Sequence, residues 1–326
     1  MKRPAAASLV LVAMMSAVLV PATSANHGLI SRTDGPWTYK YGIADTDGLV
    51  LQEVKYNGKF VFGKFSLVQV EVEYIENGVT DFVLYDEMGH GSSTQTTLYP
   101  PYGALQRTIG GDGTVYLTQD FRSSSWAPTN LCDYRYKAEY HLHPNGDIHP
   151  WVWTYGPGCA QSTHTARYHF FFRADFDIRG GANDKFAHWH TTSWEVPATE
   201  AANPHHDDGD NRFGQNSGPE WQTWEPTAPL STYNFDPNTL DETELWLVQF
   251  DANTGGIGSD LIGQVVPGVA WHFPSQWSSS ESVQNVDITH WYVIHAERAP
   301  GYGNGPCWPS APCLRGPDRF NPTDNW

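Results

Sequence analysis

Basic side chains are scarce in this sequence. Its 326 residues include 19 Lys and Arg against 36 Asp and Glu, a formal net charge of −17. Nucleic acids and anionic membranes bind proteins through clusters of Lys and Arg, so neither is an expected partner. The acidic residues are scattered rather than grouped, which is typical of a solvated surface. Weak attraction of a cationic ligand is the alternative.

Several well-known catalytic motifs are also absent. The sequence contains no phosphate-binding loop, no Gly-x-Ser-x-Gly elbow, no His-Glu-x-x-His helix and no paired-cysteine zinc spacing. These absences argue against a nucleotide hydrolase, an elbow-type serine hydrolase, a zinc protease and a zinc finger. Aromatic residues make up 14% of the chain, and a carbohydrate-binding surface is one use for them.

Only one long hydrophobic run is present. It extends from Ala5 to Val20, follows Lys2 and Arg3, and precedes a short stretch of small residues that ends at Ala25. This pattern is typical of a secretory signal peptide over residues 1–25, so we expect a secreted, extracellular protein. Removal of the signal leaves 17 basic against 36 acidic side chains, a formal charge of −19. The mature form has no further run of membrane-spanning length.

Cysteine is limited to four residues. In an exported chain this number suggests two disulfides. The economical pairing joins Cys132 to Cys159 across a hairpin and Cys307 to Cys313 near the end of the chain, although other pairings remain open.

Helical periodicity is hardly visible, whereas short alternating runs with turn residues recur from Trp37 to His295. This pattern predicts an all-β fold, a large antiparallel β-sandwich that forms one domain over residues 26–326. Asn57–Gly58 predicts a tight turn between two strands, with a separate third strand running on to Tyr74. Residues 89–130 are predicted to form loops and edge strands.

A second hairpin is predicted around residues 134–153. Its first strand alternates, with Tyr134, Tyr136, Ala138, Tyr140 and Leu142 on one face and His141 and His143 on the other. Asn145–Gly146 predicts a two-residue turn. That turn places His149 opposite Leu142 and facing away from the histidine pair, and two ligands alone bind a metal poorly.

Tyr134 stands twelve residues before Gly146. This arrangement resembles the quinone-bearing strand of the copper amine oxidases, in which an Asn-Tyr-Asp/Glu tyrosine precedes a glycine-containing turn by the same spacing. In this chain Asp133 and Arg135 flank the tyrosine. The resemblance implies that Tyr134 is the precursor of a trihydroxyphenylalanine quinone, and the alternative is a packed strand tyrosine.

Further segments resemble the same family. Residues 48–74 resemble the start of its catalytic domain, in which a short hairpin is followed by a strand similar to residues 66–74. Residues 85–91 stand where the family has Phe-Asp-x-Gly-Glu-Tyr-Gly. The resemblance implies that Asp86 is the general base, a role that needs a pKa raised by burial; a loop aspartate is the alternative. Residues 163–183 resemble its His-x-His strand, and residues 287–295 resemble the segment near its third copper ligand.

The copper(II) ligands implied by the resemblance depend on the alignment. Without gaps, the three positions are Ala166, Tyr168 and Arg298, none of which is a histidine. With a bulge and a gap, the candidate ligands are His164, His169 and His295. Other clusters that hold either a metal or only solvent are His188 with His190, and His205–Asp208.

The family activity implied by the resemblance is oxidative deamination of a primary amine by oxygen, which yields an aldehyde, ammonia and hydrogen peroxide. The competing hypothesis is a non-catalytic secreted relative that has lost the copper site and acts as a binding or structural protein. Family members are homodimers with interlocking arms, so residues 184–244, predicted as surface excursions, are candidates for pairing.

Overall fold

The structure is a computed structural model. It describes residues 27–45, 47–91, 97–127, 132–155, 159, 164–175, 184–190, 193–195, 198–199, 201–205, 213–217, 220–224, 243–249, 282–298 and 313–315. The predicted signal peptide lies outside these ranges and stays a prediction. Within the described residues, no helix has the length and apolar character needed to cross a membrane.

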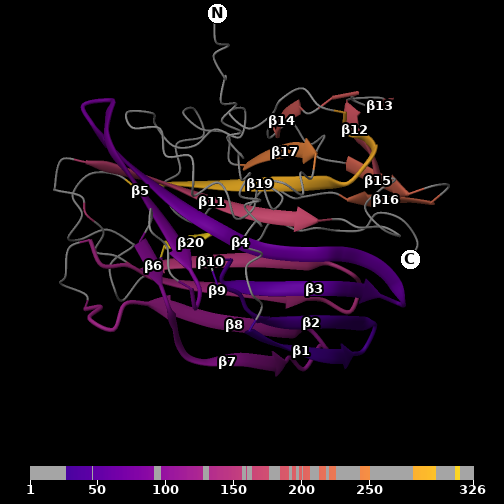
Figure 1. The fold of residues 1–326 in the computed structure, drawn as a ribbon, viewed down its shortest axis with the longest axis horizontal. Helices are drawn as coiled ribbons and strands as arrows, with labels where there is room; N and C mark the ends of the chain where they lie inside the picture. The colour runs from indigo at the N-terminus through magenta and orange to yellow at the C-terminus, as the bar shows by residue number, and fades with distance from the viewer. Residues whose placement is uncertain are drawn as a thin grey trace, which may run out of the picture.

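Every element of the described chain is a β-strand, arranged in three sheets (Figure 1). The largest sheet has ten strands. Eight of them lie in the spatial order β1 (His27–Asp34), β2 (Trp37–Ile43), β3 (Leu49–Tyr56), β4 (Lys59–Glu76), β11 (Thr165–Asp175), β19 (Ile288–Arg298), β17 (Thr243–Gln249) and β14 (Ala201–His205). β5 (Val79–Met88) pairs with β4, and β6 (Thr97–Tyr99) pairs in parallel with β5.

The second sheet has five strands, in the order β20 (Cys313–Arg315), β10 (Ile148–Tyr155), β9 (Arg135–Leu142), β8 (Val115–Arg122) and β7 (Pro101–Ile109). The third sheet contains β13 (Ser193–Glu195), β12 (Asp184–His190), β15 (Phe213–Ser217) and β16 (Glu220–Trp224), with β18 (Gln284–Val286) paired to β12. Strands therefore account for much of the predicted excursion at 184–244. The predicted all-β sandwich is confirmed.

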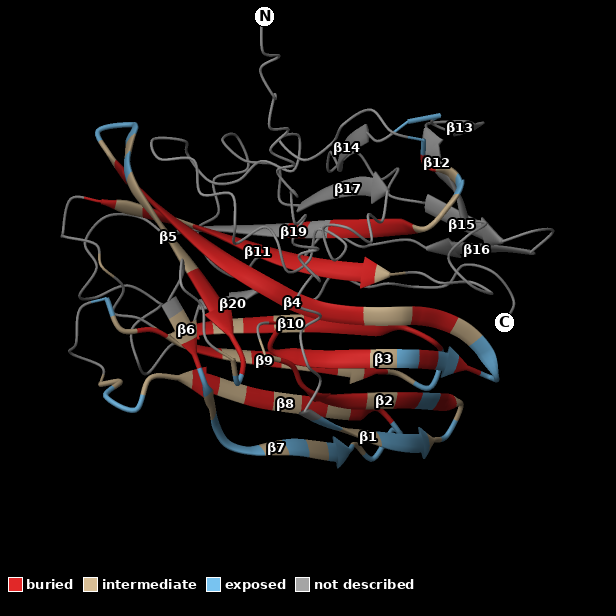
Figure 2. Cartoon of the chain, viewed as in Figure 1, coloured by how far each residue is buried: buried red, intermediate tan, exposed pale blue. Residues whose placement is uncertain are grey.

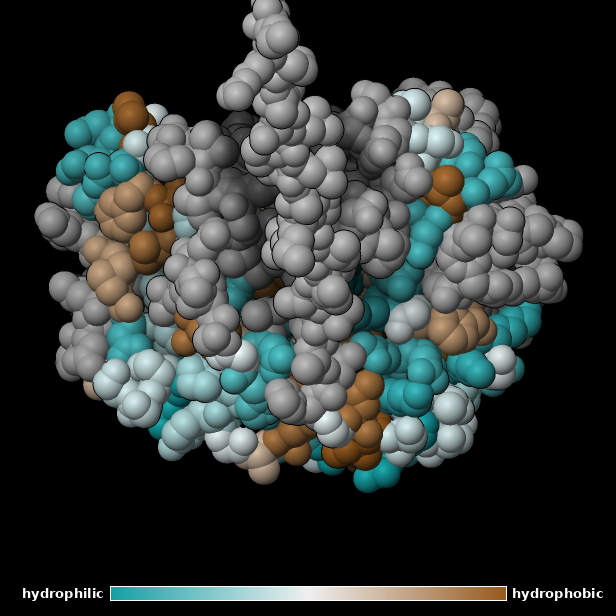
Figure 3. All heavy atoms as spheres, in the orientation of Figure 1, coloured by the Kyte–Doolittle hydropathy of each residue, from teal (hydrophilic) through white to brown (hydrophobic). Residues whose placement is uncertain are grey.

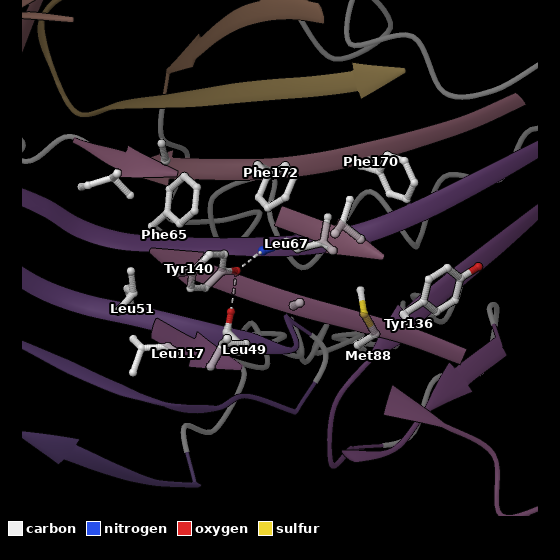
Figure 4. Packing of buried hydrophobic residues seen from close by; sticks show 14 of the residues in the cluster. Leu49, Leu51, Phe65, Leu67, Met88, Leu117, Tyr136, Tyr140, Phe170 and Phe172 are labelled. Carbon is white, nitrogen blue, oxygen red and sulfur yellow. Dashed lines mark hydrogen bonds between the residues drawn. The ribbon is translucent and has the colours of Figure 1, made fainter. Parts of the chain in front are cut away.

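The sandwich core lies between the first half of the ten-stranded sheet and the β7–β10 sheet. Figure 2 shows buried residues concentrated in β3, β4 and β11, and exposed residues along β1 and β7. Tyr140 joins the two layers, because its hydroxyl donates to the carbonyl of Leu49 (2.8 Å) and accepts from the amide of Leu67 (3.0 Å), as Figure 4 shows. Its ring also meets Phe65 edge-on at 5.2 Å.

The prediction of two separate strands before Tyr74 is wrong. Lys59–Glu76 is a single strand of 18 residues rather than two successive strands. Its first half pairs with β3 and its second half with β5, while β11 pairs with it continuously from Lys64 to Ile75 on the other edge apart from one register shift. β11 spans the change of partner from β3 to β5, which lies between Ser66 and Val70, and so joins the two halves into one strand.

Residues 89–130 also differ in part from the prediction. β6 and β7 lie at sheet edges as predicted, but β8 is an interior strand between β7 and β9.

The face shown in Figure 3 mixes hydrophilic side chains with small groups of hydrophobic ones. Tyr102, on β7, has 51% of its surface exposed.

The turn between β9 and β10 is one residue longer than predicted. The His143 amide donates to the Asp147 carbonyl (2.9 Å) and the Gly146 amide donates to the His143 carbonyl (3.0 Å), so Pro144–Gly146 form the loop. A two-residue turn would be closed by Pro144, which has no amide hydrogen for the closing bond. Closure at His143 restores that bond, and Gly146 takes the left-handed conformation with φ +99°.

This turn shifts the hairpin register. Ile148 pairs with Leu142, and His149 pairs with His141. A one-residue shift moves a side chain to the opposite face of a strand. The prediction that His149 faces away from His141 and His143 is therefore wrong, and the three histidines share one face.

The predicted disulfide between Cys132 and Cys159 is confirmed, with a Cα–Cα distance of 4.2 Å. It links the segment that enters β9 to the segment that follows β10. The second predicted pair includes Cys307, which lies outside the described residues, so that pairing stays a prediction.

Candidate functional site

Tyr134 lies at the inner face of the sandwich, immediately before β9. Alternation along β9 buries Tyr136, Ala138, Tyr140 and Leu142 on the same face, as predicted. The Tyr134 ring stacks on Tyr136 with centroids 5.6 Å apart. It meets the ring of Tyr168, on β11, edge-on at 6.4 Å. Aromatic packing from two sheets therefore holds this tyrosine.

The hydroxyl of Tyr134 is hydrogen-bonded to the hydroxyl of Tyr74, on β4. The same Tyr74 hydroxyl accepts a hydrogen bond from the backbone amide of Cys159 at 2.8 Å. Since Cys159 is joined to Cys132, two residues before Tyr134, the disulfide and the hydroxyl pair hold one end of the hairpin against β4.

Asp86, near the end of β5, is the second predicted site residue, and the structure places it close to Tyr134. The Tyr136 hydroxyl donates a hydrogen bond to its carboxylate. Burial raises the pKa of Asp86 to about 7, and the Tyr136 hydrogen bond opposes that rise. Tyr99 packs edge-on against both Tyr134 and Tyr136, with centroids 6.4 and 5.5 Å away. A carboxyl group with this pKa suits a general base near neutral pH.

These groups are sealed in the core. Tyr134 and Tyr136 have 0% of their surface exposed, and Asp86 has 1%. A substrate therefore has no direct contact with them in this conformation.

The positions that an ungapped alignment assigns to copper ligands do gather beside Tyr134. Ala166 pairs with Tyr74 on one side and with Arg298 on the other. Tyr168, two residues along the same strand, touches the Tyr134 ring. Their placement fits the resemblance, but none of the three side chains is an imidazole: a methyl group cannot bind copper, a guanidinium stays cationic and repels it, and the phenol of Tyr168 packs against the Tyr134 ring.

His164 and His169, two of the histidines offered by a gapped alignment, lie on opposite faces of the ten-stranded sheet. His164 lies edge-on to Tyr74, with ring centroids 6.4 Å apart, and its Nε2 is 3.2 Å from Asp81 Oδ2. The Nε2 of His169 lies 3.7 Å from Glu73 Oε2. Tyr74 and Glu73 are consecutive residues of β4 and point to opposite faces.

His295 pairs with His169 across β11 and β19. It is therefore placed by register beside His169 rather than beside His164, which comes one residue before β11 begins at Thr165. Among the described side chains, His164 is the one candidate ligand on the Tyr134 side. The described residues on that side therefore do not fit a three-histidine copper site.

The remaining predicted clusters are placed only by their backbone. His188 and His190 belong to β12, and His205 ends β14. His206–Asp208 lie outside the described residues.

The structure brings together one cluster that the sequence did not predict. His141, His143 and His149 each offer a ligand atom, and these atoms lie within 4.8 Å of one another. The cluster lies on the face of β9 and β10 turned away from Tyr134. Pro144, which precedes Asn145–Gly146, is the sequence feature from which this cluster could have been predicted, because proline at that position requires the longer turn.

Comparison with solved structures places the fold among the amine oxidases. The lysyl oxidase of Pichia pastoris superposes with a TM-score of 0.56 and 13% identity, over 89% of this chain and 51% of that chain. A copper-containing benzylamine oxidase from Hansenula polymorpha gives 0.51 and 10%, over 90% and 60%. An amine oxidase from Aspergillus nidulans gives 0.52 and 14%, over 97% and 56%.

These identities show a shared fold and no more. The chain spans about half the length of the lysyl oxidase it matches, 51% of that chain. No family model and no curated protein matches the sequence.

Proposed function

We propose that this protein is a secreted, non-oxidase relative of the amine oxidases, a binding protein built on their β-sandwich. One observation carries the proposal. Ala166, Tyr168 and Arg298 occupy adjacent places beside Tyr134 and Tyr74, where the resemblance expects copper ligands, and they supply no imidazole. The three imidazoles of a copper site thus correspond to a methyl group, a phenol and a guanidinium in this sequence.

The surroundings of Tyr134 support the same proposal. Its hydroxyl already has a hydrogen-bond partner in Tyr74, and its ring is enclosed by Tyr99, Tyr136 and Tyr168. Such packing stabilises the junction between the two sheets, as expected for a buried tyrosine whose hydroxyl is satisfied. Secretion is supported by the N-terminal sequence pattern and by the Cys132–Cys159 disulfide.

The second candidate function is oxidative deamination of a primary amine, with water and oxygen consumed and aldehyde, ammonia and hydrogen peroxide formed. The observation that favours it is Asp86, whose buried carboxyl has a pKa of about 7 and lies against the Tyr136 hydroxyl beside Tyr134. In that function Tyr134 is the quinone precursor, Asp86 is the base, and the ligands come from His164, His169 and His295 after a rearrangement of β11. A homodimer belongs to the same proposal.

One experiment separates the two functions. Protein expressed and reconstituted with copper is assayed for quinone by redox-cycling stain and for peroxide released on addition of primary amines. We expect neither signal, and a Tyr134→Phe variant that is indistinguishable from the wild type in both assays. A quinone signal that disappears in Tyr134→Phe would overturn the proposal and establish the oxidase.

A further inference from the structure

We propose that His141, His143 and His149 bind a divalent first-row transition-metal ion, with Zn²⁺ and Cu²⁺ as the principal candidates. The site lies on the outer face of the β9–β10 hairpin, whereas Tyr134 belongs to the inner face. It is therefore separate from the position where the amine oxidase resemblance expects copper. Metal binding at this site does not require Tyr134 to be catalytic.

Hairpin geometry brings the three imidazoles together. His141 and His143 are alternate residues, which point to one face of a strand, and His149 is directly across from His141. The Nε2 of His143 lies 3.0 Å from the Nδ1 of His149, and their ring centroids are 4.1 Å apart. The rings of His141 and His143 have centroids 6.4 Å apart.

The spacing is close to that of a metal site. Histidine nitrogens bind Zn²⁺ at about 2.1 Å, so two such nitrogens in a tetrahedral site lie about 3.4 Å apart. The three ligand atoms here lie within 4.8 Å of one another. Small side-chain rotations that draw the widest pair together by roughly 1.4 Å, and open the His143–His149 contact slightly, are sufficient to enclose an ion.

Second partners orient the rings of His141 and His143, and a carboxylate lies near His149. Glu139 Oε2 lies 3.1 Å from His141 Nε2, and the Thr114 hydroxyl lies 3.1 Å from His143 Nδ1. Asp147 Oδ2 lies 4.0 Å from His149 Nε2. Metal-bound histidines commonly direct their other nitrogen at a carboxylate or another hydrogen-bond partner, which fixes the ring and strengthens the ligand.

The backbone under the site is well supported. The Trp37 indole donates to the carbonyl of His143 (2.7 Å), and the Tyr56 hydroxyl donates to the carbonyl of Pro144 (2.8 Å). The neighbouring β7–β8 turn lies against this turn, because a Cβ placed on Gly113 would come within 3.2 Å of the Pro144 ring. A site that is rigid before binding loses little conformational entropy when the ion enters.

Packing also positions His141. Its ring stacks on Trp151 at 5.6 Å and meets Tyr116 edge-on at 4.6 Å. His149 is 9% exposed, and His141 and His143 are partly exposed. The cluster is thus reachable from solvent while its rings are held.

The donor set indicates the class of ion. Three imidazoles suit Zn²⁺, Cu²⁺ and Ni²⁺, whereas Ca²⁺ and Mg²⁺ require oxygen ligands. Glu139 and Asp147 lie beside the imidazoles and offset part of the charge of a divalent cation. Three protein ligands leave one tetrahedral position for water or another molecule.

The test uses mature protein purified without a polyhistidine tag and stripped of metal. ZnCl₂ is titrated by calorimetry, and bound metal per chain is measured after desalting. The site variants are His143→Gln and His149→Gln. The matched controls are His90→Gln, which alters an exposed histidine, and His164→Gln, which alters the imidazole near Tyr74.

We expect one Zn²⁺ per chain, with affinity lowered at least about 100-fold in each site variant and unchanged in both controls, because loss of a ligand costs more than the 10–100-fold that loss of a supporting partner costs. Cu²⁺ bound in place of Zn²⁺ should show nitrogen coupling in its electron paramagnetic resonance spectrum, and this coupling should diminish in His143→Gln. If a site variant fails to fold in chelator, Glu139→Gln, which keeps all three imidazoles, replaces it and should weaken binding 10–100-fold.

Absence of stoichiometric Zn²⁺, binding unchanged by the site variants, or binding lost only in His164→Gln would each overturn the site and leave a hydrogen-bonded histidine pair with a purely structural role. Failure of metal binding is distinguishable from failure of the proposed function. The proposed function is tested by the quinone stain and the peroxide assay, with Tyr134→Phe as the variant.

Discussion

The hydroxyl of Tyr136 donates a hydrogen bond to the carboxylate of Asp86, and the two residues, 50 positions apart in sequence, are both buried in the core. This contact joins β5 of the large sheet to β9 of the smaller one. A titratable carboxyl group at such a position links the folding equilibrium to pH.

Asp86→Asn tests this link. Burial raises the pKa of Asp86 from 3.8 to about 7, so between these values the folded protein keeps a proton that the unfolded chain has lost. The stability contributed by this group is complete below about pH 4 and decreases by about 1.4 kcal/mol per pH unit as pH rises towards 7. Asparagine is neutral throughout and retains an acceptor for Tyr136.

The measurement is the free energy of unfolding of wild type and Asp86→Asn in urea from pH 4 to pH 8. Carboxylates with lowered pKa values, such as Asp34 and Glu73, act in the opposite direction, but they are common to both proteins and cancel in the difference. Wild type minus variant should fall by roughly 4 kcal/mol across this range. A difference that stays constant would show that the pKa of Asp86 is not raised.

Tyr74→Phe should destabilise the protein more than Tyr134→Phe. The Tyr74 hydroxyl contacts the Tyr134 hydroxyl and also accepts from the Cys159 amide, so its loss removes two hydrogen bonds. Loss of the Tyr134 hydroxyl leaves the Tyr74–Cys159 bond in place. We expect a difference of about 1 kcal/mol in the free energy of unfolding, measured in urea with the disulfide intact. Equal costs, or a larger cost for Tyr134→Phe, would contradict this assignment.

Tyr140→Phe removes a hydroxyl that serves two buried backbone groups, the Leu67 amide and the Leu49 carbonyl. Each buried group that loses its partner costs about 1–3 kcal/mol, so we expect a loss of about 2 kcal/mol or more in thermal or urea unfolding. Tyr102→Phe is the matched control. The residue Tyr102 is 51% exposed, and loss of its hydroxyl should change stability by less than about 0.5 kcal/mol. Similar effects of the two substitutions would argue against the role of Tyr140 at the sheet junction.

Several features were predictable because they depend on neighbouring residues along the chain. Alternation in residues 134–142 assigned Tyr134 and His141 to opposite faces, and the structure agrees. The proximity of Cys132 and Cys159 followed from the hairpin between them. The alternating sequence of residues 287–295 indicated β19, whereas β11 was indicated by its resemblance to a strand of the amine oxidases.

Other features were not predictable because they depend on register and on distant partners. Asn145–Gly146 favours a two-residue turn, but Pro144 lacks the amide that closes it, and the resulting one-residue shift brings His149 beside His141. The length of β4 was likewise decided by its pairing with β11.

The sequence by itself determined the all-β class and the two faces of β9, and it favoured the Cys132–Cys159 pairing, because the two-residue period of a strand and the closeness of hairpin ends are local properties. Only the tertiary structure decided that Ala166, Tyr168 and Arg298 adjoin one another near Tyr134, that Asp86 is buried enough to raise its pKa, and that three histidines converge. Each of those outcomes depends on strand register or on desolvation by residues far away in the chain, and neither is encoded in a short stretch of sequence.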